Sequence, residues 1–355
     1  MVKSIYLTSY NEGVGKTLIA IGLIQKYKKE GYNVQYFKPV GEPIGAFSNK
    51  SDRDVSFIFM NLIETKYEMD IVCPVSINLS YYVDYIDMNQ RKECLEKIKN
   101  AYNAIAKDAD VIIIEGTPNF AYFCRVGLDD ITIAKELGIS DIYFVDSTSS
   151  DKFIDLLLFS KKYFDFREIN MNGIILNQIN FDFVPRIKEL NEKHIKKYDI
   201  PIIGIMEKEP LIAEPTVDEI LEGIGAELIN NPPPSALRNR VKSILIGAMS
   251  LEHALKYFRQ SQEAAVITGG DRTDLQMGAL ESHISVLILT GYIQPDTAVK
   301  TKANEMGIPI LLSPSDTYTT MYNIERIRPG LQPEEKEIAL NMVEKSLNWD
   351  LLKPS

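Results

Sequence analysis

Cysteine and histidine are both scarce in this chain of 355 residues, which contains three of each. Cys73, Cys94 and Cys124 are widely spaced and too few for a disulfide framework, and no Cys/His spacing matches a zinc site. Long apolar runs are absent too, because no stretch reaches the length that crosses a bilayer. We therefore expect a soluble protein of a reducing compartment, without a disulfide scaffold, a zinc centre or a membrane span.

The chain does not carry a net positive charge. It contains 39 Lys and Arg residues in total and 49 Asp and Glu residues, which gives a net charge of −10. Such a chain gains nothing from counterion release on a polyphosphate strand, so we expect no nucleic-acid partner. The first residues, Met1-Val2-Lys3, lead into a strand rather than a signal peptide, which favours a cytoplasmic location. Hydrophobic residues make up 45% of the chain, enough for a large core in two domains.

The first half alternates short β-rich runs with longer helical ones, a pattern typical of an α/β fold with a parallel sheet and crossover helices. The expected strands are Ser4–Ser9, Asn33–Lys38, Asp110–Glu115, Asp141–Asp146, Gly173–Asn177 and Ile202–Met206. The expected helices are Thr17–Glu30, Gln90–Lys107, Asp151–Phe164 and Arg186–Tyr198. Continuous apolar strands such as residues 111–114 suit a sheet that is buried on both faces.

A second, smaller α/β series starts near Val241. Its expected strands are Lys242–Ile246, Ala264–Thr268, Val286–Thr290 and Ile308–Leu312, and its expected helices are Leu251–Gln260, Asp274–Ser282, Asp296–Met306 and Thr317–Arg326. The run Asn231-Pro232-Pro233-Pro234 indicates a rigid linker or exposed turn. We therefore predict a first domain over residues 1–212, a linker over 213–240, a second domain over 241–330, and a C-terminal helix within 331–355.

The most informative motif lies after the first strand, where residues 10–17 read YNEGVGKT and an apolar helical stretch follows. This strand–loop–helix order is typical of the phosphate-binding loop of P-loop NTPases. Lys16 would reach the outer phosphates, and Thr17 would give a hydroxyl to Mg²⁺. The expected nucleotide-binding residues of the loop are Glu12, Gly13, Val14, Gly15, Lys16, Thr17 and Leu18. The alternative is an ordinary glycine turn between a strand and a helix.

Ligands of parallel α/β sheets bind at the carboxyl ends of the strands, so residues in those positions are the next candidates. Glu115 ends an apolar strand and could hold Mg²⁺ beside Thr17, or simply face solvent. Lys38 ends the second expected strand, and its charge would suit a γ-phosphate or an anionic substrate; alternatively, it is a solvated lysine at a strand end. We therefore expect catalytic roles for Lys16 and Lys38.

Two further residues complete the predicted site. Asp54 begins an apolar helix, where it could be a helix cap or a second metal-binding carboxylate. Asn177 ends another strand, and its amide offers a donor and an acceptor that match the edge of adenine. The predicted metal residues are thus Thr17, Asp54 and Glu115, and the predicted cofactors are ATP and Mg²⁺.

With these residues assembled, the first 210 positions resemble dethiobiotin synthetase and its relatives. The resemblance rests on Gly15-Lys16-Thr17, Phe37-Lys38-Pro39-Val40, Asp54, Glu115-Gly116 and Asn177. That family uses ATP and Mg²⁺ to close a cyclic urea through a carbamate that attacks the γ-phosphate. The chain departs from the family where Ser9 replaces the first loop glycine and where Thr117-Pro118-Asn119-Phe120 replaces the glycine-rich segment of the diamine pocket. The resemblance therefore implies ATP binding, but not the biotin-pathway substrate.

The second half resembles a DRTGG domain. The matching segments are residues 244–249, 268–273, 288–291 and 316–320, although Asp274-Leu275 stands where the name motif has its final glycines. Together the two halves resemble the N-terminal part of long phosphotransacetylases. The acyltransferase domain of those enzymes does not appear in the sequence, so we expect no acetyl-transfer activity.

Gly270, Asp271 and Arg272 are candidate ligand-binding residues of the second domain, because they follow a strand. Arg272 could pair with an anion; alternatively, Asp271 only caps the next helix.

Two functions remain in view. In the first, the chain is a Mg-ATP-binding protein and slow ATPase whose second domain senses a small anionic metabolite or mediates assembly. In the second, it is an ATP-dependent ligase or carboxylase in which a carboxylate or carbamate attacks the γ-phosphate near Lys38. Relatives of this loop class are often dimers, so we expect a homodimer or a higher homo-oligomer.

Overall fold

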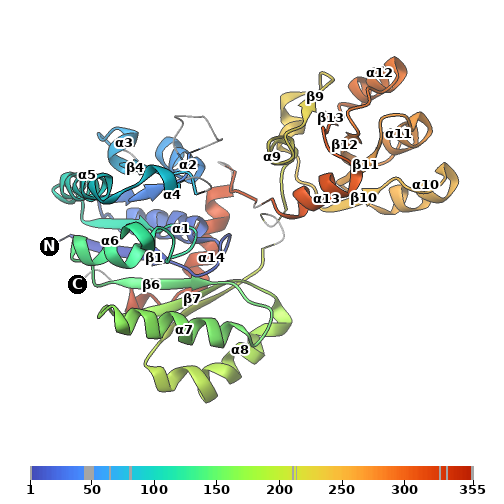
Figure 1. The fold of residues 1–355 in the computed structure, drawn as a ribbon. Helices are drawn as coiled ribbons and strands as arrows, with labels where there is room; N and C mark the ends of the chain where they lie inside the picture. The colour runs from blue at the N-terminus through green and yellow to red at the C-terminus, as the bar shows by residue number, and fades with distance from the viewer. Residues whose placement is uncertain are drawn as a thin grey trace. The chain divides into compact units, whose positions relative to one another are not determined.

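The computed structural model describes residues 2–43, 52–63, 65–79, 82–209, 212, 214–327, 329–332 and 335–352. The chain divides into two compact units, Met1–Glu209 with Leu331–Ser355, and Pro210–Gly330 (Figure 1). Each unit is an α/β fold with helices on both faces of a central sheet, so the predicted fold class is confirmed. No helix in the described ranges is long and apolar enough to span a bilayer.

The first unit is built on a six-stranded parallel sheet in the order β2-β5-β1-β6-β7-β8. Its strands are β1 (Lys3–Thr8), β2 (Val34–Phe37), β5 (Val111–Glu115), β6 (Ile142–Asp146), β7 (Gly173–Ile179) and β8 (Ile202–Glu207). All six were expected from the sequence within a few residues. A two-stranded pair, β3 (Val40–Gly41) with β4 (Val75–Ser76), was not expected, because each strand has only two residues.

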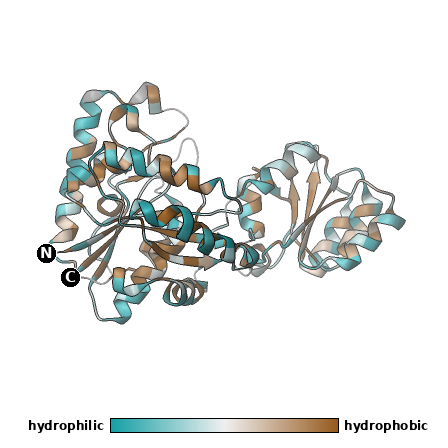
Figure 2. Cartoon of the chain, turned by 90° about the horizontal axis from the view of Figure 1, so that it is seen from below, coloured by the Kyte–Doolittle hydropathy of each residue, from teal (hydrophilic) through white to brown (hydrophobic). Residues whose placement is uncertain are grey.

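Helices cover both faces of this sheet, and the strand side chains alternate between the two resulting cores. One core contains α1 (Lys16–Lys29), α2 (Arg53–Asn61) and α14 (Lys336–Ser346). The other contains α5 (Met88–Ala106), α6 (Asp130–Leu137), α7 (Phe153–Phe166) and α8 (Val184–Leu190). In β1, for example, Ile5 and Leu7 belong to the first core and Tyr6 to the second. The strands are accordingly among the most hydrophobic segments in Figure 2.

Short helical segments complete the first unit. Helices α3 (Met69–Val72) and α4 (Tyr82–Tyr85) lie between α2 and α5 in the chain. The single helix expected over Arg186–Tyr198 is instead α8 followed by a π-helical turn at Asn191–Ile195 and a 3₁₀ turn at Lys196–Tyr198. A 3₁₀ turn is frequent at a helix end, whereas a π-helical turn is rare and is not indicated by a local sequence pattern.

The second unit has a five-stranded sheet in the order β10-β11-β12-β13-β9. Strands β10 (Ser243–Ile246), β11 (Ala264–Gly269), β12 (Ile284–Thr290) and β13 (Ile310–Leu312) are parallel, and β9 (Glu227–Leu228) joins β13 antiparallel. Helices α10 (Leu251–Gln260), α11 (Thr273–Leu280) and α12 (Thr297–Met306) pack on one face, and α9 (Val217–Gly223) and α13 (Thr317–Glu325) on the other. The segment 213–240, expected as a linker, thus holds α9 and β9 and forms part of this unit.

Helix α14 follows the second unit in sequence but belongs to the first. It packs directly on α1, where a side chain at Gly22 would come within 2.3 Å of Val343 Cγ2. Leu347, after the end of α14, reaches Gly204 of β8 in the same way, at 2.5 Å. The two glycines allow this close approach because they carry no Cβ. The last helix therefore fills part of the first unit's core.

We expect Leu347→Ala to lower the free energy of unfolding of the first unit by about 2–5 kcal/mol, because it leaves a cavity in that core. Leu347 is 6% exposed, whereas Leu351, four residues later, is 44% exposed and serves as the matched control. Calorimetry should show the first unit's transition shifted in Leu347→Ala and nearly unchanged in Leu351→Ala. Equal shifts in the two variants would contradict this role of the C-terminal segment.

Candidate functional site

The loop between β1 and α1 presents its backbone at the carboxyl edge of the first sheet. Gly15 precedes α1 with φ +86°, a left-handed conformation that favours glycine. The first N–H groups of α1 then lack helical partners and point toward the loop, which is the arrangement that binds phosphate groups. β1 is flanked by β5 on one side and β6 on the other, so the loop lies where the strand order reverses.

Lys16 is buried at the base of this loop. Its Nζ donates to Ser9 Oγ at 2.5 Å and to the Pro118 carbonyl at 3.3 Å. Burial lowers the pKa of Lys16, while the nearby carboxylates of Glu115 and Asp130 oppose that shift. Among the residues that the structure describes, the hydrogen-bond acceptors of this ammonium are neutral, and a phosphate would supply a negative charge.

Thr17, Glu115 and Tyr36 form the centre of the site. Thr17 Oγ1 donates to Glu115 Oε1 at 2.8 Å, and the Tyr36 hydroxyl donates to Glu115 Oε2 at 2.8 Å. Glu115 is only 3% exposed, and burial raises its pKa, while the nearby Lys38 acts in the opposite direction. The predicted pair of Thr17 and Glu115 is thus brought together, and Glu115 does not face solvent.

Lys38 lies next to the same carboxylate. Its Nζ is 2.9 Å from Asp52 Oδ2, 3.4 Å from Asp54 Oδ2 and 3.8 Å from Glu115 Oε1. Burial would lower the pKa of Lys38, but the three carboxylates outweigh it and raise the pKa well above its ordinary value. The carboxylates therefore favour the charged form of Lys38, which is buried and is not a solvated strand-end lysine.

Asp52 was not among the predicted site residues. It is the N-cap of α2, where its Oδ1 accepts from the backbone N–H groups of Asp54 and Val55, and its Oδ2 accepts from Glu42 N–H. Its side chain is buried, and Lys38 contributes to lowering its pKa against the effect of burial. Asp54, by contrast, is 43% exposed. The sequence signal for Asp52 is an acid directly before the apolar helix, because that is the N-cap position.

Asn177 lies behind the loop rather than in solvent. Its Nδ2 donates to the Val14 carbonyl at 2.9 Å, and a side chain at Gly15 would come within 2.2 Å of that nitrogen. Its Oδ1 is buried and has no hydrogen-bond partner among the described residues. Gln178, next in the chain, donates to the Gly13 carbonyl at 3.1 Å. The end of β7 thus supports the loop and leaves one buried acceptor unused.

Asp130 is a second buried acid that the sequence reasoning missed. It accepts hydrogen bonds from Thr8 Oγ1 at 2.5 Å and from the Thr117 N–H at 2.9 Å, and burial raises its pKa. Gly116 leaves no room for a side chain, because a Cβ there would lie 2.1 Å from Asp130 Oδ2. Asp130 therefore links the end of β1, which leads into the loop, to the segment that follows β5.

The remaining loop residues have structural contacts. The exposed Glu12 accepts from the Tyr122 hydroxyl at 2.5 Å, and Val14 is buried. Leu18 packs against the core that contains α1 and α14. Within the described residues, no group of three or more His, Cys, Asp or Glu side chains is arranged to hold a metal.

The three ligand candidates of the second unit lie between β11 and α11. Gly270 packs against the loop after β12, because a Cβ there would lie 1.9 Å from the Ile293 carbonyl oxygen. Asp271 is exposed and does not cap α11, whose N-cap is Arg272. Arg272 bonds to Asp274 Oδ1 at 3.3 Å and to the Met249 carbonyl at 3.2 Å. The glycine is thus explained by packing, and the arginine already has anionic and carbonyl partners.

Known proteins support this division of the chain. The model of the AAA domain matches residues 3–216, and the model of the DRTGG domain matches residues 219–327. Proteins named phosphate acetyltransferase are similar over nearly the whole chain. The protein of Escherichia coli is 25% identical over 95% of this chain and 50% of its own length, and that of Synechocystis is 23% identical over 94% and 48%. The chain spans about half the length of these relatives.

Solved structures give weaker similarities. MinD of Aquifex aeolicus has a TM-score of 0.37 at 15% identity, over 59% of this chain and 84% of its own. The CBS and DRTGG domains of Clostridium perfringens pyrophosphatase have a TM-score of 0.30 at 21% identity, over 45% and 76%. Both TM-scores are too low to support a conclusion. The family models and the relatives, however, confirm the expected resemblance: the chain belongs to the AAA domain family, and a DRTGG domain follows its P-loop domain.

Proposed function

We propose that the first unit binds Mg-ATP and hydrolyses it slowly, and that the second unit regulates it. The observation that carries the proposal is the bond between Thr17 and Glu115 beside the first turn of α1. A hydroxyl and a buried carboxylate at this position supply hard oxygen atoms next to a phosphate-binding helix end. Mg²⁺ usually takes only one or two protein carboxylates and completes its shell with phosphates and water, so an all-protein cage is not required.

The unused acceptor of Asn177 favours adenine as the base. A buried polar atom without a partner costs free energy, so its retention is consistent with a ligand that supplies a donor. The exocyclic amino group of adenine is such a donor, whereas the carbonyl of guanine at the same ring position is not. We therefore propose that Asn177 Oδ1 accepts from the adenine amino group while its Nδ2 continues to hold the loop.

Lys38 would then serve two purposes. Before nucleotide binds, its charge compensates the carboxylates of Asp52, Asp54 and Glu115. After nucleotide binds, its position beside Glu115, the hydrogen-bond partner of Thr17, would let it contact the γ-phosphate.

We propose that Arg272 is the residue of the second unit that contacts a regulatory anion, in competition with Asp274.

Lys16→Ala should abolish measurable Mg-ATP binding in calorimetry, because it removes the buried ammonium that has no anionic partner of its own. The far-UV circular dichroism spectrum should stay unchanged. Lys29→Ala is the control, since Lys29 lies on the same helix with an exposed side chain. Undiminished affinity of Lys16→Ala for Mg-ATP would refute the nucleotide assignment.

Asn177→Ala should lower ATP affinity roughly two- to twelvefold, the effect of one net hydrogen bond, and should reduce the preference for ATP over GTP. Gln178→Ala removes a bond to the loop but no contact with the base, so it should change the two affinities in parallel. Competition binding with both nucleotides separates these effects. If the two variants alter the ATP-to-GTP ratio alike, Asn177 does not select the base.

Lys38→Met should lower the free energy of unfolding by about 3–5 kcal/mol, because Asp52 and Glu115 would remain buried without a counter-charge. Lys66→Met is the control: Lys66 is 69% exposed and pairs with Asp108 at 2.7 Å, an arrangement that is worth about 1 kcal/mol at most. Denaturant unfolding of the first unit measures both. A small and equal effect of the two substitutions would mean that Lys38 does not compensate the carboxylates.

A further inference from the structure

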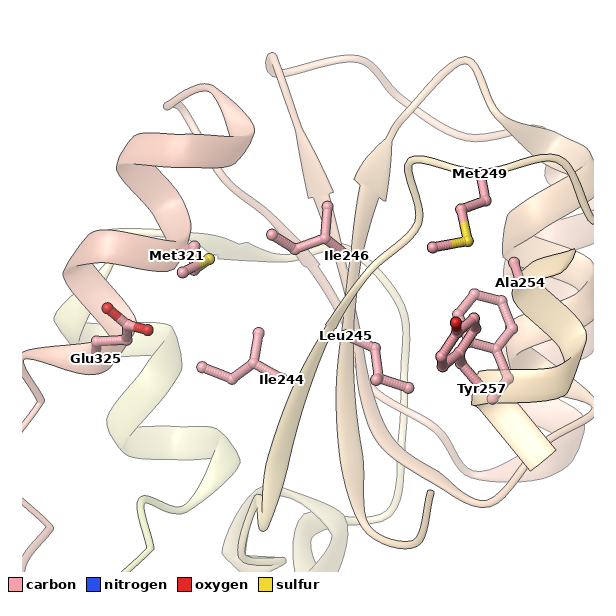
Figure 3. Close-up of a pocket in the computed structure, with 9 residues that line it drawn as sticks. Ile244, Leu245, Ile246, Met249, Ala254, Tyr257, Met321 and Glu325 are labelled. Carbon is pink, nitrogen blue, oxygen red and sulfur yellow. The ribbon is translucent and has the colours of Figure 1, made fainter. Parts of the chain in front are cut away.

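Strand β10 forms one edge of the second unit's sheet, and its outer side has no strand partner among the described residues. A cavity of about 390 Å³ runs along this edge and extends over both faces of the strand. Figure 3 shows Ile244, Ile246 and Met321 on one side of the strand and Leu245 and Tyr257 on the other. The groove is therefore an open backbone edge with an apolar well on each face.

The backbone of this edge is available for pairing. Gly247 N–H, just after the strand, donates inward to Ile267 O on β11, so by alternation the N–H groups of Ile246 and Ile244 point outward. Proline and charged side chains commonly protect an edge strand from pairing with another chain. The residues of β10, Ser243 to Ile246, include neither. Lys242, before the strand, is held by Glu263 at 2.5 Å.

The opposite edge of the same sheet is protected. It is formed by β9, which has only two residues, one of them the exposed Glu227. The fold thus closes one edge with a two-residue strand that carries a charge, and leaves the other edge, the four-residue β10, apolar and without proline or charge. An edge of that kind is suited to accept an additional strand, whose backbone forms the hydrogen bonds and whose alternate side chains enter the two wells.

We propose that the strand that pairs with β10 is β10 of a second copy of this chain, antiparallel about a two-fold axis at Leu245. A fitting strand must carry aliphatic side chains on both faces, and β10 does so, with Ile244 and Ile246 on one face and Leu245 on the other. The two-fold operation places Ile244 of one copy opposite Ile246 of the other, so the contact is self-complementary. The two five-stranded sheets then become one continuous sheet.

The charges around the groove agree with a second copy. Glu325 is the charged residue among those that line it. The strand that pairs carries no charged side chain in either copy, so the pairing buries no charge on the strand itself. The half-exposed Met249 and Tyr257 would be covered at the same time.

The first test is the oligomeric state of the full chain by analytical ultracentrifugation. Wild-type protein should form a dimer, and Ile246→Lys should raise its dissociation constant on the order of a hundredfold, because two lysines would be buried against isoleucines. Ile246 is 42% exposed, so the substitution does not disturb the core. Met306→Lys, at a 50% exposed position on α12, is the control and should dimerise like wild type. A monomeric wild type, or equal dimerisation of both variants, would overturn the proposal.

The second test identifies the register. Leu245 would face its own copy in a non-hydrogen-bonded pair, with Cα atoms about 4.5 Å apart, which is within the range of a disulfide. Leu245→Cys should therefore form a covalent dimer under mild oxidation, and wild type and Met306→Cys should not. Covalent dimers in equal yield from all three proteins would point to the native cysteines and contradict this pairing.

Discussion

The arrangement of the first unit depends on one buried positive charge, the ammonium of Lys38. Three carboxylates from two separate segments approach it, Asp52 and Asp54 from the start of α2 and Glu115 from the end of β5. Without that charge, the carboxylates would have to be protonated or exposed, because isolated ions are costly to bury. The lysine therefore fixes the position of α2 against the sheet, and through Glu115 it fixes the hydroxyl of Thr17.

The same edge of the sheet collects the rest of the site because parallel strands end together. The loop after β1, the carboxylate at the end of β5 and the amide near the end of β7 come from segments that are far apart in sequence. Their contacts with one another are direct hydrogen bonds, so the loop is held in shape by its neighbours. A rigid, preformed loop of this kind loses little conformational entropy when a ligand binds.

Local patterns predicted the sheet strands of both units and the residues at their ends, because buried parallel strands form continuous apolar runs. The residues that the sequence did not reveal are those whose role depends on distant partners. Asp52 could be recognised as a helix cap, but its pairing with Lys38 depends on where α2 packs. Asp130 lies at the start of a helix and contacts Thr8, 122 positions earlier in the chain. β9 and the two-residue pair β3 and β4 are too short to produce a pattern.

The return of α14 to the first unit has a consequence for how the protein is made. The first unit's core includes Val343 and Leu347, which are synthesised after every residue of the second unit. During translation, the second unit can complete its own core first, while the surface of α1 that α14 later covers is still exposed. The order of folding therefore differs from the order of the sequence, and the N-terminal unit would be the last to become fully stable.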